Sequence, residues 1–461
     1  MKKLVCISPI NGSVYAERKV DSRELVEDRL RSARKAQRGW SVLPVSKRRA
    51  IVDKAIEILA DMNEDLVTHL AWQMGRPIRY GGEIGGVKER AGYMSDIAEQ
   101  ALSPSVIEDS SGFRRYISRE PLGLILVIAP WNYPYMTAIN AIVPGLIAGN
   151  AVFLKHATQT LLVGEHLEQA FAQAGLPDGL FCNLRLDHEL TASLIAARCF
   201  DFVNFTGSVN AGRSIERAAA GTFIGLGLEL GGKDPGYVRH DADLDAAVDT
   251  LIDGAMFNSG QCCCGIERIY VHNALFDDFC AKATTIVSGY HLGNPLESQT
   301  TLGPMANLRF ANLVREQISE AISAGATPLV DGAGFEMDTG DSTYLAPQIL
   351  VNVDHSMRVM KEESFGPVVG IVKVDSDEEA VSLMNDSDFG LTASIWSSET
   401  SVVEQIGRKL QTGTVFMNRC DYLDPALCWT GCKDTGRGMS LSAQGYQSLT
   451  RVKSYHLKQA I

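Results

Sequence analysis

Long hydrophobic runs are absent from this sequence. The longest, residues 124–129, is far shorter than the roughly 20 residues that a membrane-spanning helix requires. The N-terminus carries only a short apolar stretch, residues 4–7, whereas a secretory signal needs about 7–15 apolar residues. We therefore expect no membrane association and a cytoplasmic location.

An excess of positive charge is also missing. The 43 Lys and Arg residues are outnumbered by 55 Asp and Glu residues, which gives a formal net charge of −12. Such a chain repels a phosphate backbone, so we expect no nucleic-acid partner. A cationic small molecule would be attracted instead.

The ten cysteines show neither a disulfide framework nor a metal-binding pattern. Three of them are consecutive, residues 262–264, and adjacent cysteines are poorly placed for structural disulfides. Cys420, Cys428 and Cys432 have no C-x-x-C spacing, and no pair of histidines lies near them. The sequence therefore predicts free thiols and no metal site.

A complete glycine fingerprint for a nucleotide is lacking as well. Residues 225–227 begin a G-x-G-x-x-G motif, but position 230 is Leu. No segment completes a Walker-type phosphate loop either. General motif rules alone therefore predict no nucleotide site.

The pattern that is present alternates strands and helices. Residues 124–129 and 151–155 are continuous apolar runs typical of strands buried on both faces, and helices are expected from about 134 and over 161–174. This favours an α/β fold with a doubly wound parallel sheet, and a second such series begins near residue 231. Further expected helices cover 21–70 (with a break at Pro44), 242–260, 274–288 and 377–386, and further strands cover 113–119, 200–205, 268–271, 368–373, 393–396 and 447–461.

Three short segments contain residues suited to catalysis. A cysteine in the glycine-containing stretch 257–264 would be a nucleophile if its surroundings lower its pKa, although a plain buried cysteine fits equally well. Glu229 lies between leucines, so burial would make it a better base, but it also fits a surface helix end. Asn132 follows a buried strand and would offer an amide to an oxyanion, or simply form a turn.

Taken together, seven segments in order resemble the aldehyde dehydrogenase superfamily. The resemblance implies a variant Rossmann cofactor domain, an α/β catalytic domain and a β oligomerisation arm, in a homodimer or homotetramer. The cofactor domain would comprise residues 1–106 and 125–230 with 425–440 returning to it, the catalytic domain 231–424, and the arm 107–124 and 441–461. The matching segments are residues 130–134, 154–155, 205–208, 229–233, 257–263, 362–367 and 431–438.

The resemblance also implies catalytic roles. Cys263 lies two places after Gly260-Gln261 and matches the nucleophile that attacks an aldehyde. The Asn132 amide and the Cys263 backbone N–H would hold the oxyanion, and Glu229 would activate water to hydrolyse the thioester. Lys155 is expected to belong to the catalytic residues as well as to the cofactor-binding residues.

The expected cofactor is NAD or NADP. By the same resemblance, Lys155 matches the lysine at the adenine ribose and Ser208 a residue at the pyrophosphate. Glu363 with Phe365 beside it matches the contact to the nicotinamide ribose, and Trp131 is expected at the adenosine-side wall. NAD-preferring relatives often carry a Glu three places after the lysine; Thr158 stands there and removes its repulsion of a 2′-phosphate, so NADP should be tolerated.

The substrate residues point in two directions. Tyr133, Cys262 and Cys264 are expected to line the tunnel. Asp421 and Asp424 would form an acidic mouth for an amino-aldehyde, whereas Arg419 would bind a carboxylated aldehyde such as succinic semialdehyde. These charges also fit a solvated rim, so the choice stays open.

Other functions remain as alternatives. A CoA-acylating aldehyde dehydrogenase shares the fold and the cysteine but typically lacks the base carboxylate, which Glu229 supplies here. A non-catalytic protein that retained the fold would have no need to keep Asn132, Glu229 and Cys263 together. A thioesterase would turn over an activated ester without nicotinamide.

Overall fold

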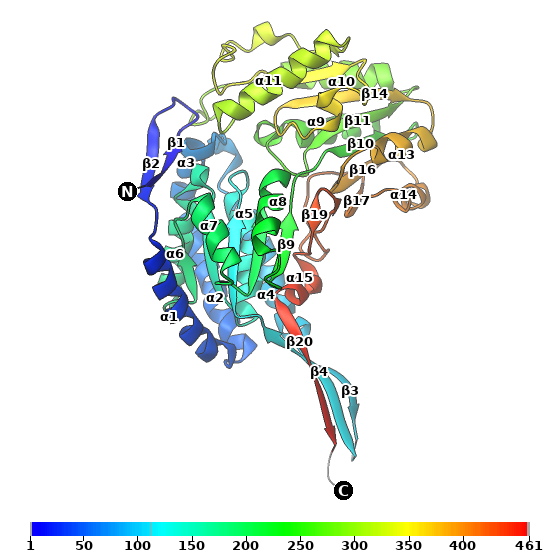
Figure 1. Cartoon of the computed structure of the whole chain (residues 1–461). Coiled ribbons are helices and arrows are strands. Elements are labelled where there is room, and N and C mark those ends of the chain that lie inside the picture. The colour runs from blue at the N-terminus through cyan, green and yellow to red at the C-terminus, as the bar shows by residue number, and fades with distance from the viewer. Residues whose placement is uncertain (1, 111, 459–461) are drawn as a thin grey trace.

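The computed structural model describes residues 2–110 and 112–458 of the chain. Two large, mostly parallel sheets form the body, and a small antiparallel sheet projects from it (Figure 1). No helix among the described residues is long and apolar enough to span a membrane. The predicted α/β fold with two strand–helix series is confirmed.

The first large sheet is parallel except for one short edge strand. All six residues of its central strand, LILVIA, are buried, because helices cover both faces of the sheet. The short edge strand β19 runs antiparallel to its neighbour β9. The strand order is β19 (Gly436–Arg437), β9 (Gly225–Glu229), β8 (Phe202–Thr206), β5 (Leu124–Ala129), β6 (Ala151–His156) and β7 (Phe181–Asn183).

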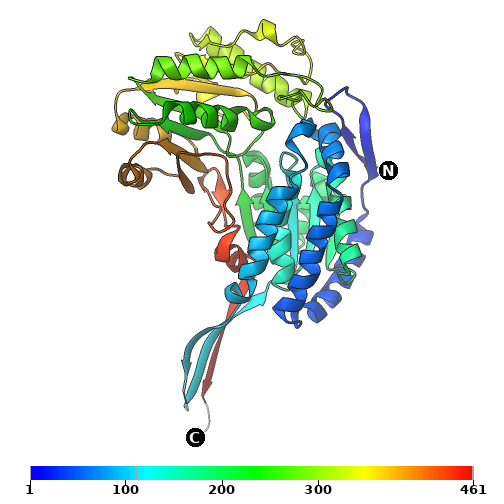
Figure 2. The same ribbon diagram turned by 180° about the vertical axis from the view of Figure 1, so that it is seen from behind.

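Helices on the two faces of this sheet come from different parts of the chain. Helices α7 (His188–Ala196) and α8 (Val209–Ala219) lie in front in Figure 1, and the N-terminal helices cover the opposite side in Figure 2. Several begin where side chains cap backbone N–H groups, for example Ser208 before α8. The remaining helices are α1 (Arg23–Ser41), α2 (Val45–Asp61), α3 (Asn63–Met74), α4 (Ile84–Ala101), α5 (Pro134–Ile147), α6 (Val163–Ala174) and α15 (Ser442–Ser448).

The second large sheet follows the same plan. It is parallel except for β12, and its strand order is β12 (Thr327–Pro328), β13 (Gln348–Val351), β14 (Val368–Val374), β11 (Ile266–His272), β10 (Asp234–Val238), β16 (Thr392–Trp396) and β17 (Thr414–Met417). Its helices are α9 (Leu244–Met256), α10 (Phe276–Ser288), α11 (Leu308–Ser323), α12 (Arg358–Lys361), α13 (Asp377–Asn385) and α14 (Thr400–Gly407). A ribbon of β15 (Phe389–Gly390) and β18 (Cys432–Lys433) lies beside them.

Two small sheets complete the fold. Strands β1 (Lys3–Ile7) and β2 (Val14–Lys19) form an N-terminal hairpin. Strands β3 (Ser105–Asp109), β4 (Phe113–Pro121) and β20 (Thr450–Lys458) form the projecting sheet, where the rings of Tyr116 and Tyr455 stack 4.5 Å apart. We call this sheet the arm. The division of the chain into cofactor, catalytic and arm regions stays a prediction.

Some expected elements differ from the structure. The expected helix 242–260 is wrong at its end, because α9 stops at Met256 and the chain turns left-handed at Asn258. The helical stretch 21–70 contains a further break at Met62 in addition to Pro44. Strands β9 and β10 were not expected, because their glycines and Pro235 obscure the apolar pattern.

Candidate active site

A strained turn carries the central cysteine. In the nucleophile loop (residues 257–264), Asn258 and Ser259 have φ values of 54° and 55°, which residues other than glycine rarely adopt. Gly260 follows with φ 68°, and a Cβ there would lie 2.2 Å from the carbonyl oxygen of Gly366. The turn reverses the chain after α9 and delivers Cys263 to the space between the two large sheets.

Buried amides hold this turn in place. The Asn258 Nδ2 donates to the carbonyl oxygens of Asn132 and Gln261, each at 3.3 Å, and its Oδ1 accepts from Arg76 Nε, also at 3.3 Å. Gln261 Nε2 donates to the Asn258 carbonyl at 3.0 Å, and Gln261 Oε1 accepts from the Ala306 N–H at 2.8 Å. These bonds compensate for the backbone strain and leave the loop with one arrangement.

A buried ion pair lies next to the side-chain amide of Asn258. Arg76 Nη1 lies 2.6 Å from Glu83 Oε1, and Arg76 Nη2 donates to the Asn132 carbonyl at 2.5 Å. The other Glu83 oxygen accepts from the N–H groups of Tyr135 and Met136, at the positive end of α5. Sequence reasoning missed this pair. The signal was two charged residues inside a turn-rich stretch, where solvent exposure was the simpler expectation.

The predicted oxyanion residue is well positioned. Asn132 is buried, and its Nδ2 donates to the Gln261 carbonyl at 3.1 Å. An amide nitrogen carries two hydrogens, so the second is free for a developing oxyanion. The next residue, Tyr133, lies with its ring 4.7 Å from the Arg76 guanidinium.

Only one of the three consecutive cysteines reaches the central cavity. Cys263 lines it, whereas Cys262 and Cys264 are buried behind it with exposures of 4% and 1%. Both buried thiols donate to Asp421 Oδ1, at 3.1 and 2.9 Å. This is a different role from the tunnel lining that the sequence predicted for them.

The neighbouring thiols also affect the nucleophile. Hydrogen bonds from Cys262 and Cys264 lower the pKa of the Cys263 thiol, while burial and the Asp421 charge oppose that effect. The interaction with Cys263 raises the pKa of Cys262 to about 12, so Cys262 stays a thiol. Each thiol has one hydrogen, so donation to Asp421 and donation to Cys263 are alternatives.

The predicted base lies across the same cavity. Glu229 ends β9, and burial raises the pKa of its carboxyl group. The Thr206 hydroxyl donates to Glu229 Oε2 at 3.1 Å and opposes the shift. A carboxylate with a raised pKa is a stronger base, as deprotonation of water requires.

A second carboxylate is held at the mouth of the cavity. Glu363 Oε1 accepts from the Gly232 N–H at 3.0 Å, and burial, with the nearby charge of Glu267, raises the pKa of Glu363 to about 8. The loop that carries it is anchored by a buried ion pair, Lys233 Nζ to Glu267 Oε2 at 2.5 Å. The Phe365 N–H donates to the same Glu267 carboxylate at 2.9 Å. Sequence reasoning did not identify Glu267.

Trp131 packs against two aromatic rings at the cavity. Its ring stacks on Phe310 at 5.4 Å and meets the edge of Phe365 at 5.6 Å. It therefore lies beside the residue expected near the nicotinamide ribose, and its own expected contact with the adenosine-side wall stays a prediction. Phe310 comes from α11, which no motif had marked.

The remaining cofactor candidates lie at the carboxyl ends of strands. Ser208 caps α8 and lines the cavity. Lys155 is the penultimate residue of β6, is 6% exposed and is not among the residues that line the cavity; within the described residues its ammonium group has no hydrogen bond or ion pair. Thr158 follows at the start of a short 3₁₀ turn. An unpaired buried cation beside a neutral Thr158 suits an anionic group.

All the central groups share one cavity of about 240 Å³. It brings Asn132, Glu229, Cys263 and Glu363 together from four separate stretches of sequence. Its wall is largely apolar, which strengthens electrostatic interactions inside it. The other lining residues are Pro130, Trp131, Thr137, Asn140, Thr206, Gly207, Ser208, Leu230, Gly231, Phe310, Leu313, Ser364, Phe365, Leu423 and Trp429.

The expected acidic mouth is not formed. Asp421 accepts from the two buried thiols, and Asp424 Oδ1 accepts from the Ala426 N–H at 2.8 Å in a local turn. Arg419 is exposed and lies 4.0 Å from the centre of the Tyr422 ring, with no ion pair inside the described ranges. In the rim segment (residues 418–424), Arg419 and Asp424 therefore both remain without an ion pair among the described residues.

Comparison with known proteins agrees with this geometry. A sequence model described as the aldehyde dehydrogenase family matches residues 1–455. The chain belongs to the aldehyde dehydrogenase family. The predicted enzyme class, the oxidation of an aldehyde and the NAD or NADP cofactor are confirmed.

Individual members of the aldehyde dehydrogenase family align along most of the chain. A succinate-semialdehyde dehydrogenase [NADP(+)] of Deinococcus radiodurans is 32% identical over 422 residues, 91% of this chain and 88% of that protein. The structure of a succinic semialdehyde dehydrogenase from Streptococcus pyogenes with NADP+ has a TM-score of 0.93 at 28% identity, covering 99% of this chain and 100% of that one. An NAD-dependent aldehyde dehydrogenase from Sinorhizobium meliloti has a TM-score of 0.94 at 29% identity, covering 100% and 92%.

Proposed function

We infer that Cys263, Asn132 and Glu229 carry out the oxidation as nucleophile, oxyanion donor and base. The observation that carries this assignment is the shared cavity: Cys263 is the one cysteine of residues 262–264 that lines it, and Asn132 and Glu229 line it too.

In the first half-reaction the Cys263 thiolate adds to the aldehyde carbon. A C–S bond forms, and the carbonyl electrons move to oxygen, where the Asn132 Nδ2 and the Cys263 N–H stabilise the negative charge. The nicotinamide, when bound, accepts the hydride that leaves this carbon. Reformation of the carbonyl then leaves a thioester on Cys263.

In the second half-reaction Glu229 removes a proton from water. The hydroxyl attacks the thioester carbon, the C–S bond breaks, and the carboxylic acid leaves while Cys263 returns to a thiolate. A separate base is needed because the nucleophile is blocked at this stage. Glu229 also separates this mechanism from CoA-dependent acyl transfer, in which no water is activated.

A panel of aldehydes with NAD and with NADP tests the assignment. We expect reduced nicotinamide to form without CoA, in a burst followed by a slower steady state. Turnover only after CoA is added would replace Glu229-dependent hydrolysis with acyl transfer to CoA. Ester hydrolysis without any nicotinamide reduction would favour a thioesterase, and silence with both would favour a non-catalytic protein.

We also infer a preference for NADP. The buried, unpaired Lys155 provides a cation, and Thr158 brings no carboxylate to repel a 2′-phosphate. Ser208 and Glu363 suit the pyrophosphate and a ribose. Thr158→Glu should raise the KM for NADP about 10-fold or more and leave that for NAD nearly unchanged. Equal losses for both cofactors would contradict this role.

For the substrate we favour an ω-carboxy aldehyde. Arg419 is exposed and makes no ion pair within the described residues, whereas Asp421 accepts from two buried thiols and Asp424 from the backbone of its own turn. Two of the aligned relatives are named as succinate-semialdehyde dehydrogenases. In the panel, succinic semialdehyde should therefore show a higher kcat/KM than an ω-amino aldehyde of similar length; the reverse order would refute the choice.

We further infer a homo-oligomer assembled through the arm, and a cytoplasmic location. Three large apolar side chains on the arm are exposed: Val106 at 63%, Ile107 at 62% and Val452 at 63%. Exposed apolar side chains on a projecting antiparallel sheet are typical of strands that pair with another subunit. Sedimentation of the full chain should give a dimer or tetramer, and Val452→Lys should shift it towards monomer.

A further inference from the structure

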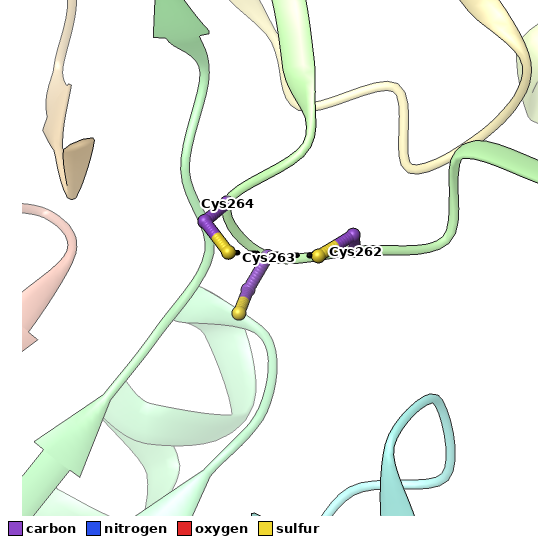
Figure 3. A group of neighbouring side chains, drawn as sticks. All are labelled: Cys262, Cys263 and Cys264. Carbon is purple, nitrogen blue, oxygen red and sulfur yellow. Dashed lines mark hydrogen bonds between the residues drawn. The ribbon is translucent and has the colours of Figure 1, made fainter. Parts of the chain in front are cut away.

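The three consecutive thiols form a compact cluster that the mechanism uses only in part. Their sulfur atoms all lie within 4.8 Å of one another, and those of Cys262 and Cys264 are 3.6 Å apart (Figure 3). Neighbouring side chains along an extended chain normally point to opposite sides. Here the Cys262 and Cys264 sulfurs face each other, and the Cys263 sulfur points to one side of the line between them, towards the cavity.

A carboxylate contacts two of the three thiols. Asp421 Oδ1 lies 2.9 Å from the Cys264 sulfur and 3.1 Å from the Cys262 sulfur. The hydrogen bonds described for this carboxylate come from these two thiols. Asp421 itself has a φ of 49°, so the backbone is strained where it presents the carboxylate.

We propose that Cys262, Cys263, Cys264 and Asp421 bind one thiophilic divalent cation, such as Zn²⁺, at the nucleophile. Three sulfurs and one carboxylate oxygen form a tetrahedral donor set that zinc accepts. Zn–S bonds of about 2.3 Å place two sulfurs about 3.8 Å apart in a tetrahedral site. The observed spacing of 3.6 Å between Cys262 and Cys264 is close to this value, whereas the Cys263 and Asp421 side chains have to turn towards each other to complete the site.

Binding changes protonation and not oxidation state. Each thiol that becomes a ligand releases one proton to solvent, the sulfur donates a lone pair to the cation, and no electron is transferred. The cation enters from the cavity, because Cys263 lines it. The absence of a C-x-x-C pattern led the sequence to predict no metal site, but adjacent ligands become usable when the backbone turns this sharply.

The consequence is competition between cation and aldehyde. A sulfur bound to a cation has no free lone pair of comparable reactivity, so the metal would inhibit the oxidation reversibly. This consequence rests on the proposed role of Cys263, whereas the binding itself does not. A spectroscopic readout therefore separates the two.

Titration of the reduced, metal-free full-length protein with Cd²⁺ tests the site. We expect a cadmium–thiolate charge-transfer band in the ultraviolet that saturates at one ion per chain. Cys264→Ala and Asp421→Asn should each weaken the affinity at least about 10-fold. The matched controls Cys199→Ala and Asp424→Asn, which remove a thiol and a carboxylate outside the cluster, should leave it unchanged.

Three results would overturn the proposal. These are a titration without a saturable band, a band that Cys264→Ala leaves intact, and inhibition that a thiol reductant reverses but a chelator does not, since the last would indicate a disulfide. Calorimetry of dinucleotide binding checks that each variant is folded. If Cd²⁺ binds as expected but does not slow aldehyde oxidation, titration of Cys263→Ala decides between two conclusions. Weaker binding keeps Cys263 as a ligand and overturns its assignment as nucleophile, and unchanged binding overturns the proposed ligand set.

Discussion

The nucleophile loop and the rim segment both contain strained residues, but they are supported in different ways. Asn258 and Ser259 are buried among amides that connect to the Arg76–Glu83 ion pair. In the rim segment, Asn418 has a φ of 55° and is exposed, and among the described residues its side-chain amide bonds only to the backbone of Ser397, at 3.0 Å each way. The firmer support therefore belongs to the loop of the proposed nucleophile, and the looser support to the segment proposed to select the substrate.

The largest effect is expected at the centre of the supported loop. Cys263→Ser should lower kcat at least about 1,000-fold, because the hydroxyl does not ionise near neutral pH and is a poor nucleophile. Dinucleotide binding, measured by calorimetry, should persist. Cys264→Ser is the matched control and should retain most activity. If Cys263→Ser kept full turnover, the nucleophile would have to be Cys262 or Cys264.

A smaller loss is expected across the cavity. Glu229→Gln should slow the steady state about 100-fold and leave the burst of reduced nicotinamide, because only the hydrolytic step needs this base. Stopped-flow absorbance separates the two phases. A lost burst would instead assign Glu229 to activation of the thiol.

Glu229 also predicts a pH dependence. Burial raises its pKa, so the carboxylate form that acts as base is depleted as the pH falls. The steady-state rate of the wild type should therefore rise with pH through a limb above the ordinary carboxyl range, and Glu229→Gln should lack that limb. An unchanged limb in the variant would place the titrating group elsewhere.

The support itself is tested by two neighbouring arginines. Arg76→Met leaves Glu83 buried without its partner and should lower the free energy of unfolding by about 3 kcal/mol and kcat about 10-fold. Arg79→Met removes an exposed arginine three residues on and should change neither. Urea unfolding and steady-state kinetics measure both. Equal behaviour of the two variants would mean that the Arg76–Glu83 pair does not support the nucleophile loop.

The smallest effect is expected at the rim segment. Arg419→Ala should raise the KM for succinic semialdehyde about 3- to 5-fold, since an exposed ion pair contributes little, and leave kcat and the KM for a neutral aldehyde unchanged. Arg408→Ala, which removes another exposed arginine at the end of α14, serves as the control. A loss of kcat in Arg419→Ala would mean that the rim segment, too, supports the chemistry.

The sequence predicted the parts of this molecule that depend on local pattern. Runs such as residues 124–129 are apolar throughout, so their burial in a central strand follows from composition. Cys263, Glu229 and Asn132 belong to short motifs, and their meeting in one cavity agrees with the order of those motifs. At these positions the local sequence pattern and the tertiary structure agree.

The parts that escaped prediction depend on contacts between distant residues. Arg76 and Glu83 look like surface charges until α5 and the nucleophile loop pack against them. From sequence, Asp421 is compatible with an acidic mouth, but in the folded chain its carboxylate accepts hydrogen bonds from two thiols. Buried polar partners leave no periodic trace in sequence, because a single charged residue is compatible with either environment.

The bond between Arg76 and Asn258 joins residues 182 positions apart in the chain. During synthesis, Arg76 leaves the ribosome long before the cysteines are made, so its bond to Asn258 forms only after the later stretch has been synthesised. Until both stretches have met, residues 262–264 are three ordinary thiols in a flexible chain. Reactivity is therefore a product of completed folding, and a truncated or misassembled polypeptide does not expose an activated sulfur to the cell.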